Sequence, residues 1–349
     1  MTERVASLPH LNQPSRRVKE QTYWGAVGAK LVADKITLAA MALLLLMIVT
    51  SLAAPWLARD VFGFDPLDTD LRQRSAPPTW AATAWPKFQE FSDACQAGDC
   101  PWSMGGAILS EAVSGVGRCL AAGRGECHWM GTDQAGRDVL SRGLYGGRIS
   151  LRIGAYVAAI SMTLGVVMGL VSGYYAATLV DDAINAVIQT LGSIPLLFLL
   201  IILSRVFNPG PEGLSFLLGI FGWMGISRLI RGQIFSIRER EYIAASRAVG
   251  ASTWRILFRH LLPNVSSIVI VVGVFNIAGA IIAEASLSYL GVGIDPPLAS
   301  WGNMMQGSLG NFTAAPWLVL APGLFIFLTT LSIYLIGDGL RDALDPWVK

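Results

Sequence analysis

From Glu241 to Asn264 the sequence reads EYIAASRAVGASTWRILFRHLLPN, a polar island between two long apolar runs. Seven arginines fall between Arg228 and Arg259, although only 14% of the chain is charged. A short basic loop between membrane-length apolar stretches is typical of the cytoplasmic face of a bilayer. Helical spacing predicts two short helices, with Gly250 as a left-handed stop and Ser252 as the second cap. We interpret this segment as a docking hairpin, with a solvated basic loop as the alternative.

The composition is that of a membrane protein. Hydrophobic residues make up 53% of the 349 residues, and the formal net charge is only +2. Several apolar runs reach the roughly 20 residues needed to cross a bilayer core. The length of the first run and the polar stretch before it argue against a cleaved signal peptide. We expect an all-α protein with six transmembrane helices, near Ile36–Leu57, Ile153–Ala176, Ala183–Phe207, Leu214–Leu229, Val265–Leu290 and Trp317–Leu340.

The short loops predict the orientation of these spans. Basic residues gather before the first span and in the Arg228–Arg259 loop, whereas residues 208–213 and 291–316 contain no Lys or Arg. The positive-inside rule therefore places both termini in the cytoplasm and the long segment after the first span outside. One loop departs from this pattern, because Thr178–Asp182 is expected inside yet carries only two aspartates.

The cysteines are confined to the predicted external segment, where all four occur: Cys95, Cys100, Cys119 and Cys127. An even number of cysteines in an oxidising compartment predicts two disulfides, with three possible connectivities. A metal site is the alternative, but the spacings are poor for zinc and His128 is the only imidazole nearby.

Four blocks carry a family resemblance. They are GTDQAGRD at 131–138 with LSRGLYGGRIS at 140–150, the hairpin at 241–264, EASLSYLGVG at 284–293 and DPPLASWGN at 295–303. Together they resemble the permease subunit of an ATP-binding-cassette importer, specifically the second permease of dipeptide, oligopeptide and nickel uptake systems. The resemblance covers nearly all of residues 65–346.

The resemblance implies the permease fold of a type I importer, with a recognisable domain order. A cytoplasmic tail at 1–35 precedes a first helix at 36–58 and an external loop at 59–147. A core of five helices follows at 148–340, containing a docking loop at 231–263, and the tail at 341–349 is cytoplasmic. The chain exceeds the family pattern by an insertion at about 80–127, which is either a cap that contacts a binding protein or a tolerated surface addition.

The resemblance also implies the partners. They are a second homologous permease, two ATPase subunits, an extracytoplasmic substrate-binding protein and the lipids of a bacterial plasma membrane; no nucleic acid is expected. The sequence has no G-x-x-x-x-G-K-[ST] phosphate loop. We therefore expect a non-enzymatic chain that binds no cofactor or metal, with ATP and Mg²⁺ on its partners. Peptides are the expected cargo, with nickel or glutathione as alternatives and an ion-coupled secondary transporter less favoured.

Docking on the ATPase is assigned to seven positions of the hairpin. Small residues are expected to allow close approach, and charged residues to make the polar contacts: Glu241, Ala244, Ala245, Arg247, Gly250, Ala251 and Arg255. The family's usual Glu-Ala-Ala triplet is here Ala244-Ala245-Ser246, so a salt bridge from position 244 is excluded.

Four further residues are candidates for translocation or gating. Glu284 is a carboxylate within an apolar span, and structural hydrogen bonding is the alternative to a role in transport. Asp133, Arg137 and Asp138 are expected to form an ion-pair cluster at the outer entrance. The stripe Gly165-x3-Gly169-x3-Gly173 predicts close helix packing, either within the chain or against a second permease. Pro195 is expected to kink the third span.

Overall fold

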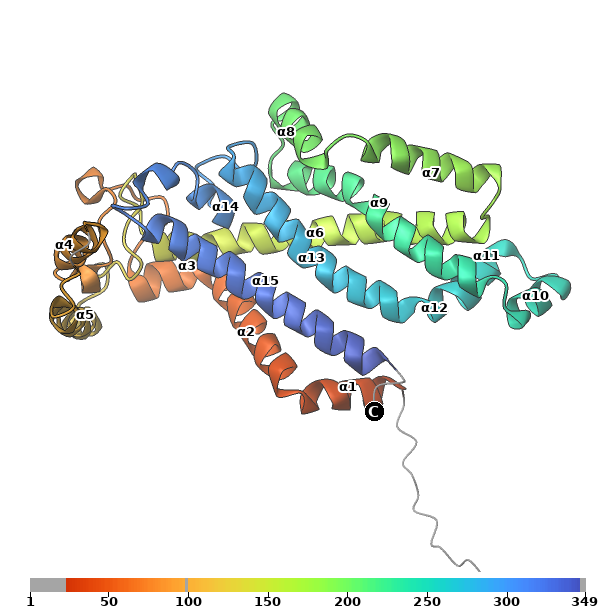
Figure 1. Cartoon of the computed structure of the whole chain (residues 1–349), viewed down its shortest axis with the longest axis horizontal. Helices are drawn as coiled ribbons and strands as arrows, with labels where there is room; N and C mark the ends of the chain where they lie inside the picture. Colours follow the sequence, from red (N-terminus) through yellow and green to blue (C-terminus); the bar gives the residue numbers. More distant parts are fainter. Residues whose placement is uncertain (1–22, 98–99, 346–349) are drawn as a thin grey trace, which may run out of the picture.

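The computed structural model describes residues 23–97 and 100–345, and in this part of the chain the regular structure is helical, without a named β-strand. The long helices form one elongated bundle (Figure 1). Their bounds are α1 (Tyr23–Ala33), α2 (Lys35–Leu52), α6 (Val139–Tyr174), α7 (Leu179–Gly192), α8 (Leu196–Phe207), α9 (Pro211–Ile237), α13 (Ser266–Tyr289) and α15 (Trp317–Leu344).

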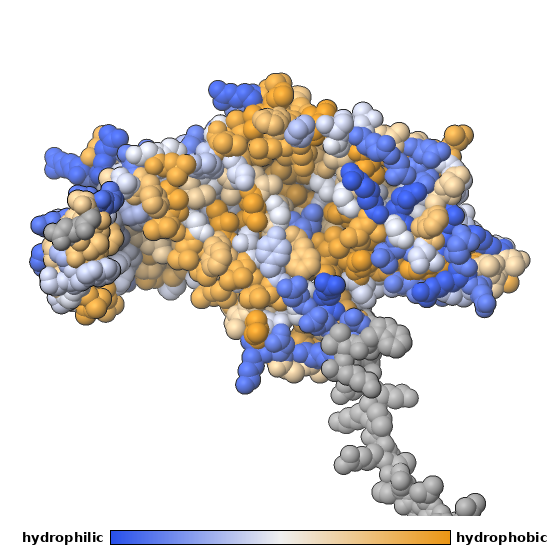
Figure 2. All heavy atoms as spheres, viewed as in Figure 1, coloured by the Kyte–Doolittle hydropathy of each residue, from blue (hydrophilic) through white to orange (hydrophobic). Residues whose placement is uncertain are grey.

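The predicted spans are present. By length and composition, α2, α6, α9, α13 and α15 can each cross a membrane, and the pair α7–α8 makes a sixth span if it is counted as one. Apolar residues cover the middle of the bundle, whereas polar residues gather at the end that carries α10 and α11 (Figure 2). The expected all-α membrane fold is confirmed, and α9 is longer than the short fourth span that we predicted.

Close packing between α6 and α9 forms the centre of the bundle. A Cβ added at Gly165, Gly169 or Gly173 would lie 2.6–2.7 Å from the Cβ atom of an α9 isoleucine, Ile226, Ile230 or Ile234 respectively. Side chains larger than hydrogen would therefore push the two helices apart. The glycine stripe therefore packs α6 against α9 of the same chain. Of the two alternatives that the sequence left open, this is packing within the chain rather than against a second permease.

Helix α6 begins far earlier than predicted. Its 36 residues start at Val139, about 14 residues before the expected start of the second span at Ile153. Charged side chains in its first turns ended the apolar run, but arginine is a good helix former and a helix continues beyond the bilayer without difficulty. The core at 148–340 consequently begins inside this helix rather than at its start.

The third predicted span is broken rather than merely kinked. Helices α7 and α8 meet at an angle of 78° across residues 193–195. Pro195 caps the start of α8 and has no N–H to continue the helix of α7. The expected position of the bend is therefore correct, but its size was underestimated.

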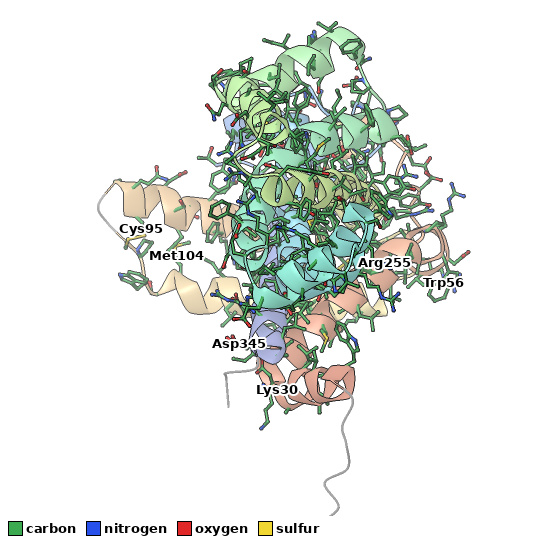
Figure 3. The ribbon with its side chains drawn as sticks, turned by 90° about the vertical axis from the view of Figure 1, so that its right-hand side faces the viewer. Lys30, Trp56, Cys95, Met104, Arg255 and Asp345 are labelled. Carbon is green, nitrogen blue, oxygen red and sulfur yellow. A yellow bond between two sulfur atoms is a disulfide. The ribbon has the colours of Figure 1, made fainter. Side chains whose placement is uncertain are left out.

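The two described ends of the chain lie at the same end of the bundle. Helix α1, within the segment that we expected to be a tail, packs Val27 against Val271, Ala343 and Leu344. Lys30 and Asp345 lie close together in Figure 3. We call this the hairpin end, because it also carries the segment after α9; residues 1–22 and 346–349 lie outside the described part.

The insertion forms a helical hairpin at the opposite end, which we call the insertion end. Helices α4 (Trp85–Gln96) and α5 (Met104–Ala121) lie side by side and project beyond the outline of the bundle (Figure 3). Disulfides join Cys95 to Cys100 and Cys119 to Cys127. Two disulfides were expected, and the structure selects one of the three connectivities.

Candidate functional site

The hairpin after α9 has a buried base. It consists of α10 (Glu241–Ala248), α11 (Thr253–Arg255), a π-helical turn (Ile256–Leu261) and α12 (Leu262–Asn264). Ile243, Ile256 and Leu261 are almost completely buried and share one apolar cluster with Ile230 and Ile234 of α9. These side chains hold the hairpin firmly against the end of the bundle.

The turn between the two short helices has the predicted geometry. Gly250 has a φ of +82°, and a Cβ added to it would meet no atom within 4 Å. Ser252 caps the following helix by accepting a hydrogen bond from the amide of Arg255 at 3.4 Å. The turn therefore needs glycine for its backbone conformation and leaves open space around it.

Most of the predicted docking positions lie on the surface. Six of the seven are exposed: Glu241, Ala244, Ala245, Arg247, Gly250 and Arg255. Ala251 is half-buried and packs against the apolar cluster at the base. Its side chain therefore packs into the buried base of the hairpin and contributes little to the exposed docking surface.

Two apolar residues at the tip were not among the predicted docking residues. Val249 is 89% exposed and Trp254 is 69% exposed. Trp254 rests on Phe258 with ring centroids 4.2 Å apart, so its orientation is held. Exposed apolar side chains in a basic loop are the sequence signal that could have identified them, because water is a poor environment for them.

The hairpin is tied to the end of α6 by two arginines. The Arg238 guanidinium donates to the carbonyl oxygens of Tyr174 and Ala176 at 3.2 and 3.1 Å. The Arg247 guanidinium lies 5.0 Å from the centre of the Tyr174 ring. These contacts join the hairpin to the end of α6, and Arg247 already has a contact within its own chain.

A large cavity extends from the loops after α2 and α13, on the side of the insertion end, to the middle of the bundle. Its volume is about 880 Å³, and α2, α6, α13, α15 and parts of the outer loops line it. We call it the vestibule. Its charged lining consists of Arg59, Arg142, Arg148, Arg152 and Asp65.

Ion pairs hold three of the four vestibule arginines. Arg59 contacts Asp65 at 2.6 Å, and this hydrogen bond raises the pKa of the Arg59 guanidinium. Arg142 is buried and lies 3.3 Å from Asp133. Arg152 lies 3.1 Å from Glu212. Four arginines and one aspartate line the vestibule, so its lining is cationic, a property that sequence reasoning missed because these residues lie far apart in the chain.

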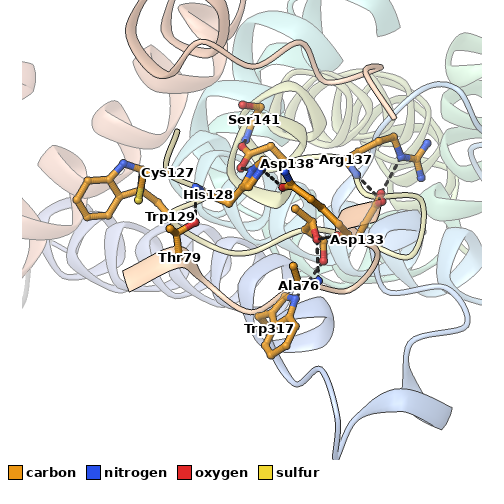
Figure 4. Close-up of polar contacts among 12 residues, drawn as sticks. Ala76, Thr79, Cys127, His128, Trp129, Asp133, Arg137, Asp138, Ser141 and Trp317 are labelled. Carbon is orange, nitrogen blue, oxygen red and sulfur yellow. Dashed lines mark hydrogen bonds and ion pairs between the residues drawn. The ribbon is translucent and has the colours of Figure 1, made fainter. Parts of the chain in front are cut away.

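The predicted outer cluster is only partly correct. Arg137 pairs with Asp133 at 2.7 Å, and the buried Arg142 is an additional partner of Asp133. Asp138 belongs to a different contact, in which its carboxylate faces His128 Nδ1 at 2.8 Å and accepts from the Ser141 amide at 2.7 Å (Figure 4). Asp138 is the N-cap of α6, which explains why it turns away from Arg137.

Glu284 is enclosed within the bundle. Its side chain is fully buried, and it accepts hydrogen bonds from the hydroxyls of Ser150 at 2.9 Å and Ser288 at 2.7 Å. The Trp301 amide in turn donates to the Ser150 hydroxyl at 3.3 Å. Glu284 thus joins α6, α13 and the outer loop, the geometry expected of a structural carboxylate.

The comparisons with known proteins agree on one family. Residues 146–349 match the model for binding-protein-dependent transport system inner membrane components, and residues 22–78 match the N-terminal TM domain of oligopeptide transport permease C. The chain is 41% identical over 223 residues to the dipeptide transport system permease protein DppC of Bacillus subtilis (strain 168). That match covers 64% of this chain and 69% of the relative.

A second relative and one solved structure are also similar to this chain. The chain is 39% identical over 230 residues to the glutathione transport system permease protein GsiD of Pectobacterium atrosepticum, covering 66% of this chain and 76% of the relative. A solved structure of the MetNI methionine ABC transporter in inward-facing conformations matches at 19% identity with a TM-score of 0.44. It covers 56% of this chain and 94% of the other.

The residues that neither family model matches include the insertion. The two family models leave residues 79–145 uncovered, and the disulfide-bonded insertion lies inside that gap. The helices around the vestibule and the hairpin lie largely in matched segments. The chain therefore belongs to the family of binding-protein-dependent transport system inner membrane components.

Proposed function

We propose that this chain is a permease subunit of an ATP-driven importer of peptides and forms half of the translocation pathway. The observation that carries the proposal is the hairpin, whose exposed tip stands on a fully buried base. A rigid projection with apolar residues and small side chains suits insertion into a cleft of a partner protein. The ATPase subunits supply the energy, because the sequence has no phosphate loop of its own.

The hairpin end faces the cytoplasm in this proposal. The basic residues of the hairpin support that orientation through the positive-inside rule. The two disulfides at the insertion end favour an oxidising compartment on the opposite side of a bacterial plasma membrane. A second homologous permease completes the pathway, and an extracytoplasmic binding protein delivers the cargo at the insertion end.

Coupling follows from the contacts of the hairpin. When the two ATPases close on ATP, they move the hairpin as a rigid body. Arg238 and Arg247 transmit this movement to Tyr174, at the end of α6. Because α6 is packed along α9 through the glycine stripe, both helices tilt together and alternate the access to the pathway.

Peptides are the cargo that the similarities favour. The relatives include a dipeptide and an oligopeptide permease of Bacillus subtilis (strain 168). Glutathione is a second candidate, favoured by the 39% identity to the glutathione permease GsiD.

The proposal is tested by purifying the tagged chain from its native membrane in mild detergent and identifying the proteins that accompany it. An ATPase and a second multi-span permease are expected. Recovery of the chain alone, in a detergent that preserves other transporter complexes, would contradict the proposal. Uptake of radiolabelled di- and tripeptides by cells with and without the gene then tests the cargo.

A further inference from the structure

Three of the four arginines that line the vestibule are paired with carboxylates of the chain, and the fourth is not. Arg59, Arg142 and Arg152 each face a carboxylate of the chain. Among the ion pairs of the described residues, none involves Arg148, whose guanidinium lies 6.0 Å from the centre of the Tyr145 ring. Arg148 is also exposed. It is therefore a lining cation that is free to take a carboxylate from outside the chain.

The position of Arg148 along the bundle indicates whether its partner is a transported solute or a lipid. Arg152 pairs with Glu212, the second residue of α9, so it lies level with the end of that span. Arg148 lies one helical turn, about 6 Å, farther from the centre of the bundle. Its charge consequently lies beyond the start of α9, on the side of the insertion end.

The floor of the vestibule has the opposite character. Below the arginines the lining is formed by aliphatic side chains of α2, α13 and α15, including Ile277 and Ile333. The cavity therefore presents a positively charged mouth above an apolar floor. A ligand that matches both parts has an acidic group at one end and an apolar body.

We propose that the vestibule binds the carboxylate of the transported molecule at Arg148 and its apolar side chains on the floor. This inference rests on the proposed function as a peptide importer and adds the group that the permease itself recognises. The planar guanidinium of arginine binds a carboxylate through two parallel hydrogen bonds. Every unmodified peptide offers such a group at its C-terminus, whatever its side chains.

The test uses the complete transporter, with its ATPases and binding protein, reconstituted in liposomes. The probes are one apolar tripeptide with a free C-terminal carboxylate and the same tripeptide with a C-terminal amide. Each variant is compared with the wild type on the same peptide, so any preference of the binding protein cancels. Arg148→Gln removes the charge, Arg148→Lys keeps it, and Arg205→Gln is the control, an exposed arginine at the end of α8 that lies outside the vestibule.

Loss of a charge-assisted hydrogen bond lowers uptake of the free acid by about tenfold or more in Arg148→Gln. Uptake of the amide changes by less than about twofold, Arg148→Lys retains most of the activity, and Arg205→Gln matches the wild type. Equal losses for both peptides, or wild-type uptake of the free acid by Arg148→Gln, would overturn the inference. Absence of uptake of either peptide by the wild type would instead overturn the proposed function, and this inference with it.

Discussion

The carboxylate of Asp181 and the guanidinium of Arg231 form a two-pronged ion pair, with distances of 2.7 and 2.6 Å. Asp181 is buried and also accepts from the Ser172 hydroxyl at 2.5 Å and from the Ala177 amide at 3.1 Å. It therefore joins α6, α7 and α9 at the hairpin end. This pair also explains why the Thr178–Asp182 loop departs from the positive-inside pattern, since the charge of Asp181 is neutralised by a basic residue from another helix.

Replacing Asp181 with asparagine is expected to destabilise the protein by about 1–3 kcal/mol, because the half-buried Arg231 loses its charged partner. The measurement is thermal unfolding of the purified protein in detergent. Asp182→Asn is the matched control, since Asp182 is adjacent and exposed. Equal unfolding temperatures for the two variants would show that the pair contributes little.

Replacing Gly169 with alanine is expected to cost about 1–3 kcal/mol of stability, because the new methyl group would overlap Ile230 and force α6 from α9. Gly225→Ala is the control, since a Cβ at Gly225 meets no atom within 4 Å. That control gains helix propensity and should be as stable as the wild type or slightly more stable. A Gly169→Ala protein with wild-type stability would contradict the packing seen between these helices.

Replacing Val249 with glutamate is expected to lower ATP-dependent uptake by about tenfold or more, since a charge at the apolar tip of the hairpin would oppose docking. The fold should remain intact, because Val249 is 89% exposed. Leu71→Glu is the control, with 69% exposure at the opposite end of the molecule. Co-purification of the ATPase is measured beside uptake. If Val249→Glu retains both ATPase binding and uptake, the tip of the hairpin is not part of the docking surface.

Thiol labelling of the denatured protein without reductant should find no free cysteine. Peptide mapping by mass spectrometry should then recover Cys95 linked to Cys100 and Cys119 linked to Cys127. Both links close short loops within the insertion, so they stabilise it locally. Recovery of a link between the two pairs would contradict the connectivity.

Replacing residues 80–127 with a short Gly-Ser linker should leave the core folded. The two ends of the insertion adjoin, because the Thr79 amide donates to the His128 carbonyl oxygen at 3.0 Å and the His128 amide to the Thr79 hydroxyl at 2.9 Å. Membrane integration and assembly with partner subunits measure the outcome. A shortened chain that is degraded would show that the core depends on the insertion, and binding-protein-dependent uptake would decide whether the insertion acts as a cap.

The predictable parts of the fold are those encoded by local patterns. Apolar length placed the spans, Gly250 and Ser252 placed the hairpin turn, and the glycine stripe indicated close packing. Each of these signals is contained within one continuous segment of the chain.

The parts that could not be predicted depend on contacts between distant segments. Glu284 meets Ser150 across 134 positions, and Asp181 meets Arg231 across 50. Asp138 was wrongly grouped with Arg137, because sequence proximity does not show that its carboxylate caps a helix and faces His128. The charge of the vestibule was hidden for the same reason, since Arg59 and Arg142 come from different elements.

The early start of α6 makes one uninterrupted rod, about 54 Å long, from its 36 residues. Arg148 lies in the third turn of the rod and lines the vestibule, and the rod ends at Tyr174, which Arg238 and Arg247 hold. Such a rod has no joint at which an angular displacement is absorbed. A small rotation imposed at Tyr174 would therefore move Arg148 sideways in proportion to the helical length between them, which is about 39 Å.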